Sequence, residues 1–216
     1  MRVLIADEFN EDCLEQLVET QAEVIYRPEL DGETLAEALA HSRPDVLIVR
    51  ETQVGDIILD ATPYLSLIIR TGDHTDNINV PLASQLGIGV ADARPVGEAK
   101  GETADERAVC IANTYQCCGR IVQCLNLQKS QMAEKMILVR HLDQPGVLAQ
   151  VFSILSKANI NVNETENLVF DGGRAACAHI RVEGPLTDAV MKQISRCHDA
   201  LIAVSVMDLP DEDEEA

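Results

Sequence analysis

The chain has 216 residues and a mass of 23.6 kDa, enough for one large domain or two small ones. Apolar residues make up 46% and charged residues 25%, as in folded globular proteins, so wholesale disorder is excluded. With 17 Lys and Arg against 36 Asp and Glu, the formal net charge is −19. A chain this acidic repels phosphate backbones and anionic lipid. We therefore expect no nucleic acid and no membrane surface as a partner.

The first hundred residues alternate between short apolar runs and amphipathic stretches. The runs at 46–49 and 67–69 are apolar at consecutive positions, which is typical of strands buried on both faces. Alternating strands and helices predict an α/β fold, a flavodoxin-like open parallel sheet whose ligands bind beyond the carboxyl ends of the strands. The predicted strands are 3–6, 22–26, 46–49, 67–69 and 88–90, with helices at 13–18, at 35–39 behind a cap at Asp31, and at 82–86.

The pattern changes in the second half of the chain. Residues 92–101 are expected to form a loop, Thr103 opens a long helical stretch to about Gln128, and 129–135 are a polar linker. The order that follows is a strand from Met136, a helix over 145–158, two strands around 171–173, a helix from Leu186 and a strand at 201–207. This order predicts a ferredoxin-like βαββαβ unit.

The most specific local motif is the turn from His141 to Val147. Pro145 suits the first helical turn, Gly146 lets a ligand approach the backbone, and the free N–H groups that follow suit a carboxylate. Asn161, at the start of the next strand, could supply an amide to a bound amino acid. On spacing alone, a well-capped turn without a ligand remains the alternative.

Residues 136–209 resemble an ACT domain, specifically the regulatory domain at the C-terminus of D-3-phosphoglycerate dehydrogenase, and we assign the unit to 135–209. The resemblance implies an effector site for a small amino acid, serine or similar. Asp143 stands where the enzyme has Asn, so the ligand need not be serine. The resemblance also implies self-association through the ACT sheets, which join side by side in this family. The implied effector residues are His141, Asp143, Gly146, Val147 and Asn161.

Residues 1–101 resemble the N-terminal substrate half of the same enzyme, a D-isomer-specific 2-hydroxyacid dehydrogenase. The resemblance lies in the runs 3–7, 44–50 and 69–78. It implies that Arg50 binds the phosphate or carboxylate of a substrate, unless the arginines are only strand-end charges in solvent. Glu51 replaces the usual Ser and would repel an anion, and His74 replaces a loop glycine. The implied substrate-binding residues are Arg50, Thr52, Arg70, Gly72, Asp76 and Asn77.

The NAD-binding domain of that family should lie between Thr103 and the ACT unit, and it is absent there. A dinucleotide site needs Gly-x-Gly-x-x-Gly between a strand and a helix, whereas the pair Gly87 and Gly89 precedes a strand. The catalytic Arg, Glu and His of the family belong to the absent domain. We therefore expect no NAD cofactor and no catalytic residue in this chain.

The seven cysteines are an odd number and scattered, which fits a reducing cytoplasm. Cys110, Cys117 and Cys124 recur every seven residues and predict a buried packing face on one helix rather than a metal site. The N-terminus meets an acid at Asp7, too early for a signal peptide, and no apolar run is long enough to span a bilayer.

The sequence leaves three functional hypotheses open. The first is a non-catalytic amino-acid-binding or regulatory protein linked to serine biosynthesis, which dimerises through its ACT domain. The alternative is a subunit or truncated form of an NAD-dependent phosphoglycerate dehydrogenase, active only with a full-length partner. A third is an internal deletion of an enzyme, natural or made. In each, residues 102–134 are a long helix and linker, and 210–216 an acidic tail.

Overall fold

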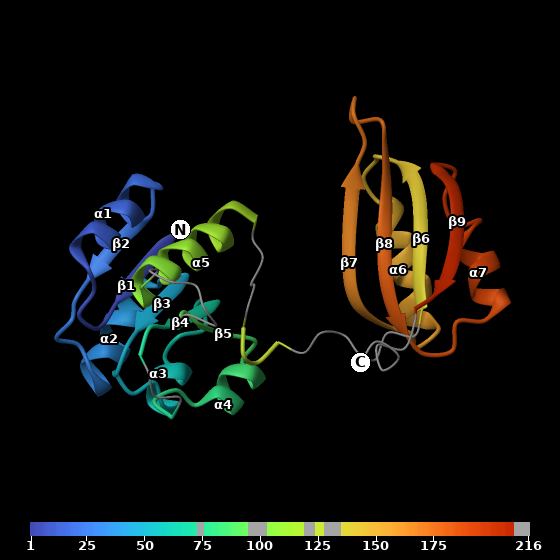
Figure 1. The fold of residues 1–216 in the computed structure, drawn as a ribbon. Coiled ribbons are helices and arrows are strands. Elements are labelled where there is room, and N and C mark those ends of the chain that lie inside the picture. Colours follow the sequence, from blue (N-terminus) through green and yellow to red (C-terminus); the bar gives the residue numbers. More distant parts are fainter. Residues whose placement is uncertain (73–75, 95–102, 119–123, 128–134, 210–216) are drawn as a thin grey trace, which may run out of the picture. The chain divides into compact units, whose positions relative to one another are not determined.

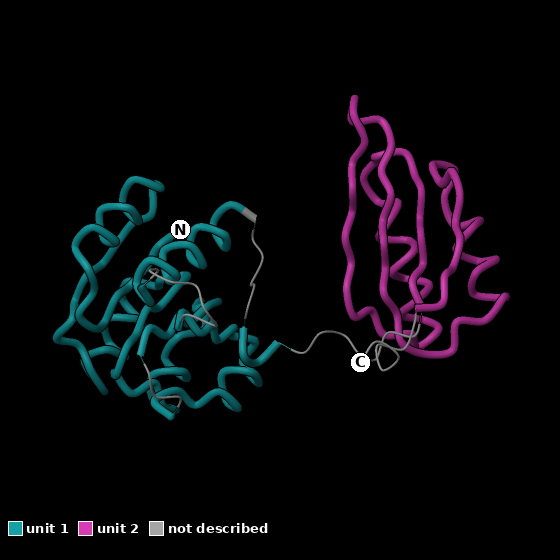
Figure 2. The backbone as a smooth tube through the Cα atoms, viewed as in Figure 1, with its two compact units in different colours: residues 1–127 teal, residues 128–216 magenta. Residues whose placement is uncertain are grey.

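The computed structural model describes residues 1–72, 76–94, 103–118, 124–127 and 135–209. The chain divides into two compact units, residues 1–127 and 128–216 (Figure 2). Each unit has a sheet and a hydrophobic core of its own. The predicted order, an α/β unit followed by a small antiparallel unit, is confirmed.

The first unit is a five-stranded parallel sheet in the order β2-β1-β3-β4-β5, with helices on both faces (Figure 1). Every residue of β3 and of β4 is buried, as expected of central strands covered on both sides. The strands are β1 (Arg2–Ile5), β2 (Glu23–Tyr26), β3 (Val46–Val49), β4 (Leu67–Arg70) and β5 (Gly89–Asp92). The helices are α1 (Glu11–Glu19), α2 (Gly32–Ser42), α3 (Asp56–Asp60), α4 (Val80–Gln85) and α5 (Ala104–Cys118).

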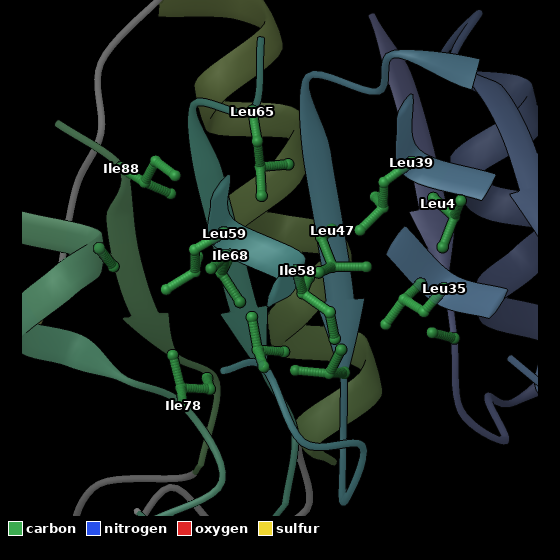
Figure 3. Packing of buried hydrophobic residues seen from close by; sticks show 14 of the residues in the cluster. Leu4, Leu35, Leu39, Leu47, Ile58, Leu59, Leu65, Ile68, Ile78 and Ile88 are labelled. Atoms are coloured by element: carbon green, nitrogen blue, oxygen red, sulfur yellow. The ribbon is translucent and has the colours of Figure 1, made fainter. Parts of the chain in front are cut away.

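The core of this unit has two apolar layers, because successive side chains of a strand point to opposite faces. On one face Leu4, Leu47 and Ile68 pack against side chains of α2, α3 and α4 (Figure 3). On the other face Val3, Ile48 and Ile69 pack against α1 and α5. The two layers hold the strands in register, and thereby fix the carboxyl ends of β1, β3, β4 and β5 at one edge of the sheet.

Helix α5 is shorter than the sequence indicates. It is described as far as Cys118, and the predicted continuation to about Gln128 is wrong at the described residues 124–127, because Cys124 forms an antiparallel bridge with Ala91 of β5. Cys110 and Cys117 are exposed, so the three cysteines do not form one buried helix face. The residues of α5 that are buried against the sheet are Ala108, Val109, Ile111 and Ala112, and the helix is therefore part of the first unit rather than of a separate linker.

The second unit is a four-stranded antiparallel sheet in the order β7-β8-β6-β9, covered by two helices (Figure 1). Alternate residues of β6 and β8, such as Val139 and Ala178, pack beneath Val151 and Leu155 of α6. The elements are β6 (Lys135–Leu142), α6 (Val147–Lys157), β7 (Asn161–Val169), β8 (Ala175–Glu183), α7 (Asp188–Ile194) and β9 (Leu201–Asp208). This is the predicted ferredoxin-like βαββαβ unit.

Within the described residues, no helix has both the length and the hydropathy that a membrane crossing requires.

Candidate functional site

The loop that follows β3 is organised by Asp7, the first acid after β1. Its Oδ2 accepts hydrogen bonds from the backbone N–H groups of Arg50 (2.6 Å), Glu51 (3.2 Å) and Thr52 (3.1 Å). Successive backbone N–H groups that converge on one point form an anion-binding nest. Here the nest is filled by a carboxylate of the chain itself. The Thr52 hydroxyl donates to the carbonyl of Ala6 (3.3 Å), so this side chain also stabilises the conformation of the loop.

Arg50, the residue expected to bind a substrate anion, is paired with Asp105 of α5. Its Nη2 donates to Oδ1 (2.8 Å) and to Oδ2 (3.1 Å) of that carboxylate. The backbone N–H of Asn10 donates to the same Oδ2 (3.1 Å), and Asp105 is only 8% exposed. Asp105 therefore occupies the position at Arg50 that an anionic ligand would take.

The side chain of Arg70 is also engaged by a carboxylate of the chain, in the interior of the first unit. It is 1% exposed, and its Nη2 donates to Oδ2 of Asp92 at the end of β5 (2.8 Å). Arg94 donates to the same carboxylate through Nε (2.9 Å). Burial alone would raise the pKa of Asp92, but the hydrogen bonds from Arg94 and the charges of Arg70 and Arg94 outweigh it and hold the pKa below its ordinary value. Arg70 is thus part of a structural ion-pair cluster.

Gly72 and Asn77 hold the loops of β3 and β4 together. Nδ2 of Asn77 donates to the carbonyl oxygens of Thr52 (3.0 Å) and Arg50 (3.3 Å). A Cβ atom on Gly72 would overlap the Arg50 carbonyl, so only glycine allows the two loops to approach this closely. Asp76 is exposed, and His74 lies outside the described residues. Of the six expected substrate residues, Arg50, Thr52, Gly72 and Asn77 are brought together, whereas Arg70 faces Asp92 and Asp76 faces solvent.

The sequence does not reveal the roles of Asp7 and Asp105. Asp7 was recognisable as a polar residue at a strand end, where ligands are expected to bind. Asp105 cannot be told apart from any other acid in the first turn of a helix, where the helix dipole stabilises a negative charge. Its contact with Arg50 joins residues 55 positions apart, and no local pattern signals it.

In the second unit, His141 lies at the end of β6 and is 2% exposed. Its Nδ1 is 2.8 Å from the carbonyl oxygen of Leu142, which can only accept, so this nitrogen carries the proton. Its Nε2 lies 3.3 Å from Oδ1 of Asn167 on β7, two strands away. The intervening β8 residues that pair with these positions, Ala176 and Ala178, are small enough to leave room for the ring. Asn167 is a site residue that the sequence did not suggest.

The turn after His141 leads into α6 with open backbone donors. Gly146 is the N-cap, in a left-handed conformation with φ of 90°, and no side chain caps the helix. Val147, the first helical residue, is fully buried and fixes the start of the helix in the core. Asp143 is exposed, and its N–H donates to the carbonyl of Arg174 (3.1 Å). The turn is therefore held firmly while its N–H groups remain available to an anion.

Asn161 does not join this group within one chain. His141 pairs with Ala176 near the start of β8, whereas Asn161 pairs with Glu183 at its end. The two β8 positions are seven residues apart, which at about 3.3 Å per residue is roughly 23 Å. The expectation that Asn161 would meet His141 and Asp143 is thus not met inside a single copy, because β6 and β7 run in the same direction and these residues lie at opposite ends of them.

The glycines that could suggest a dinucleotide site do not fit one. Gly87 follows α4 with φ of 73°, and Gly89 begins β5, so the pair makes a helix-to-strand turn and presents no helix N-terminus to a pyrophosphate. Among the described residues, no group of three or more His, Cys, Asp or Glu side chains is arranged to hold a metal ion.

Comparisons with solved structures give weak and partial similarities. A Pyrococcus horikoshii protein is 26% identical over 42% of this chain and 27% of its own length, with a TM-score of 0.39. NAD+-bound 3-phosphoglycerate dehydrogenase of Entamoeba histolytica is 24% identical over 43% of this chain and 32% of its own, with a TM-score of 0.39. NADPH-dependent glyoxylate/hydroxypyruvate reductase of Sinorhizobium meliloti is 26% identical over 44% and 29%, with a TM-score of 0.35. This chain thus spans a third or less of each of these proteins.

The family models give the assignment. No curated protein matches the chain. Residues 135–165 match the ACT domain, which covers the β6–α6 turn and the first half of β7. Residues 3–123, more than half of the chain, match the catalytic domain of the D-isomer specific 2-hydroxyacid dehydrogenases. Only residues 124–134 separate the two matches. The chain therefore belongs to the D-isomer specific 2-hydroxyacid dehydrogenase family and continues, after this segment, into an ACT domain.

Proposed function

We propose that the chain is a non-catalytic regulatory protein linked to serine biosynthesis, and that it binds a small amino acid, serine or similar, at the β6–α6 turn. One observation carries this proposal. An 11-residue helix begins at Val147, its N-cap Gly146 provides no side-chain hydrogen bond, and it follows the turn after the buried His141 inside the segment that matches the ACT domain.

The chemistry of the turn suits an amino acid. The carboxylate would accept hydrogen bonds from the free N–H groups of the first turn of α6, which contains no acidic residue to oppose it. The ammonium would meet the exposed carboxylate of Asp143. His141, whose ring is held by the Leu142 carbonyl through Nδ1, would form the wall of the site.

A second copy would supply Asn161. Strand β7 is at the edge of its sheet and has one side without a neighbouring strand among the described residues. Antiparallel pairing of two β7 strands would place Asn161 of one copy beside the end of β7 in the other, at the sheet end that carries His141. On this proposal the protein is a dimer joined through its ACT units, and amino-acid binding strengthens the pairing.

We further propose that the chain binds no NAD and transfers no hydride on its own. The pair Gly87 and Gly89 lies between a helix and a strand, the wrong order for a dinucleotide site, and Arg50 and Arg70 are each held by a carboxylate of the chain. Six cysteines have described side chains, and all six are free thiols. Free thiols favour the reducing cytoplasm as the compartment in which the protein acts.

Calorimetry of the full chain with serine, alanine and glycine, together with sedimentation, tests the proposal. We expect one of these amino acids to bind, and Asp143→Ala to weaken binding by about ten- to a hundredfold, since a charge-assisted hydrogen bond contributes roughly 1.5–3 kcal/mol. Asp188→Ala, at an exposed position on α7 and away from the β6–α6 turn, is the matched control. Absence of any binding at millimolar amino acid, or equal loss in both variants, would contradict the proposal.

A second candidate is a subunit that works with a full-length dehydrogenase. The intact first unit, whose loops still carry Arg50, Gly72 and Asn77 in contact, favours it. Co-sedimentation with a full-length phosphoglycerate dehydrogenase would support this role, and independent sedimentation of the two proteins would argue against it.

A further inference from the structure

The connection between β7 and β8 is a tight turn that contains the dipeptide Asp171-Gly172. The N–H of Gly173 donates to the carbonyl of Phe170 (3.0 Å) and closes the turn. Gly172, the third residue of the turn, has a φ of 86°, which glycine adopts without strain. Asp171 and Gly172 are both exposed, and the hairpin extends beyond the other strands of its sheet (Figure 1). The dipeptide is therefore open to water and only lightly restrained.

The two groups of this dipeptide that can react with each other are free. In the part of the chain that the structure describes, the carboxylate of Asp171 accepts no hydrogen bond and the N–H of Gly172 donates none. A Cβ atom added to Gly172 would meet no atom within 4 Å, so the space around this residue is open to the neighbouring carboxyl group. Glycine also has no side chain that would hinder a reaction at its nitrogen. The dipeptide thus meets the steric conditions for closing a ring between the nitrogen of Gly172 and Cγ of Asp171.

The same dipeptide occurs at Asp31-Gly32, where the backbone is fixed. Asp31 is the N-cap of α2, and its N–H donates to the hydroxyl oxygen of Thr34 (3.2 Å). Its carbonyl accepts from the Thr34 hydroxyl (2.7 Å) and from the N–H of Leu35 (3.0 Å). Ring closure requires rotation about the Cα–C bond of the aspartate, and at Asp31 this rotation would break both bonds to the carbonyl. The two dipeptides are therefore identical in sequence and differ in how firmly the backbone is held.

We propose that Asp171 is a site of spontaneous isoaspartate formation, and that Asp31 is protected from it by its place at the start of α2. The amide nitrogen of Gly172 attacks Cγ of the protonated Asp171 carboxyl group, whose hydroxyl leaves with the amide proton as water. The product is a five-membered succinimide ring. Water then adds to one of the two ring carbonyls. Cleavage of the new N–Cγ bond restores aspartate, whereas cleavage of the original peptide bond leaves isoaspartate, with the chain running through Cγ.

The modified residue lies close to the β6–α6 turn in the chain's hydrogen-bond network. Isoaspartate adds one carbon atom to the backbone of the hairpin. The carbonyl of Arg174, in the same hairpin, accepts the N–H of Asp143 (3.1 Å) and helps to hold that turn. A change of backbone length at Asp171 therefore acts next to this contact. The proposal concerns the covalent chain and is independent of whether the turn binds an amino acid.

Ageing of the full chain tests the proposal. The protein is kept at pH 7.4 and 37 °C for several weeks, and its peptides are analysed by electron-transfer mass spectrometry, which distinguishes isoaspartate from aspartate. We expect isoaspartate at Asp171 to exceed that at Asp31 by about tenfold or more, because closure at Asp31 must break additional hydrogen bonds. In a parallel sample unfolded in urea, the two dipeptides should react at similar rates, since neither is then restrained.

Asp171→Glu is the matched variant, because it keeps the negative charge but would have to close a larger ring, which forms far more slowly. This variant should lose the isoaspartate signal at position 171 and leave that at Asp31 unchanged. Thermal melting checks that the aged proteins are folded. Equal isoaspartate at Asp31 and Asp171 in the folded chain would overturn the proposal. So would isoaspartate at Asp171 that forms only in the unfolded sample, or a signal in the same peptide that persists in Asp171→Glu.

Discussion

A Cβ atom at Gly72 would lie 2.1 Å from the carbonyl oxygen of Arg50. The atom in the way is backbone, so neither loop can yield without moving the end of β3 or of β4. We expect Gly72→Ala to lower the free energy of unfolding by about 2–3 kcal/mol, as overpacking of a tight contact does. Urea denaturation measures this. Gly55→Ala is the control, since a Cβ there meets no atom within 4 Å, and a similar loss in both variants would refute the steric explanation.

Asp92 should make the free energy of unfolding depend on pH in the acidic range. Its pKa is lowered in the folded state, so its contribution is fully present above the unfolded pKa of about 3.9 and is lost as the pH falls through the folded value. Asp92→Asn leaves the buried Arg70 without the charge that it faces, and should cost about 3 kcal/mol at pH 7.

Denaturation series between pH 7 and pH 2 would test this prediction. The difference between the unchanged chain and Asp92→Asn should be largest at neutral pH and shrink in acid. Asp60→Asn, at an exposed position in α3, should follow the unchanged chain throughout. A difference that stays constant down to pH 2 would mean that the Asp92 charge is not the cause.

The cysteines should differ in reactivity toward alkylation. Burial raises the pKa of the Cys124 thiol to about 11, so at pH 8 roughly one molecule in a thousand carries the reactive thiolate. Burial also raises the pKa of Cys13. Cys110 and Cys117 are exposed on α5. Iodoacetamide at pH 8, followed by peptide mass spectrometry, should modify Cys110 and Cys117 first, and early modification of Cys124 would show that the segment after α5 leaves the sheet.

The architecture was largely predictable because it depends on local apolar patterns. The consecutive apolar residues at 46–49 and 67–69 match β3 and β4, and the order of elements after residue 135 matches the second unit. Helix α3 was missed because five residues are too few for a helical period to show. The end of α5 was missed because it depends on a bridge between Ala91 and Cys124, which are far apart in sequence.

The candidate sites were predictable only as residue types. Arg50 and His141 were found, but their partners Asp105 and Asn167 lie 55 and 26 positions away. No spacing rule connects such pairs. Arg50 meets Asp105 because α5 packs on the first sheet, and His141 meets Asn167 because only β8 separates β6 from β7 in the second. The position of Asn161 depends on the direction in which β7 runs in the sheet, and the residue pattern of the sequence does not give that direction.

The segment that follows α5, residues 124–127, lies along the outer side of β5 and affects how the first unit behaves in solution. Leu125 donates its N–H to the carbonyl of Val90 (2.7 Å), and the side chain of Asn126 accepts from the Val90 N–H (2.9 Å). These bonds cover the outer side of β5, where an unpaired strand would attract strands from other molecules and begin aggregation. Within the described ranges the remaining open edge is β2, which has four residues and carries the exposed Glu23. The unit is thus protected against uncontrolled strand pairing on one side by its own chain and on the other by a short, charged edge.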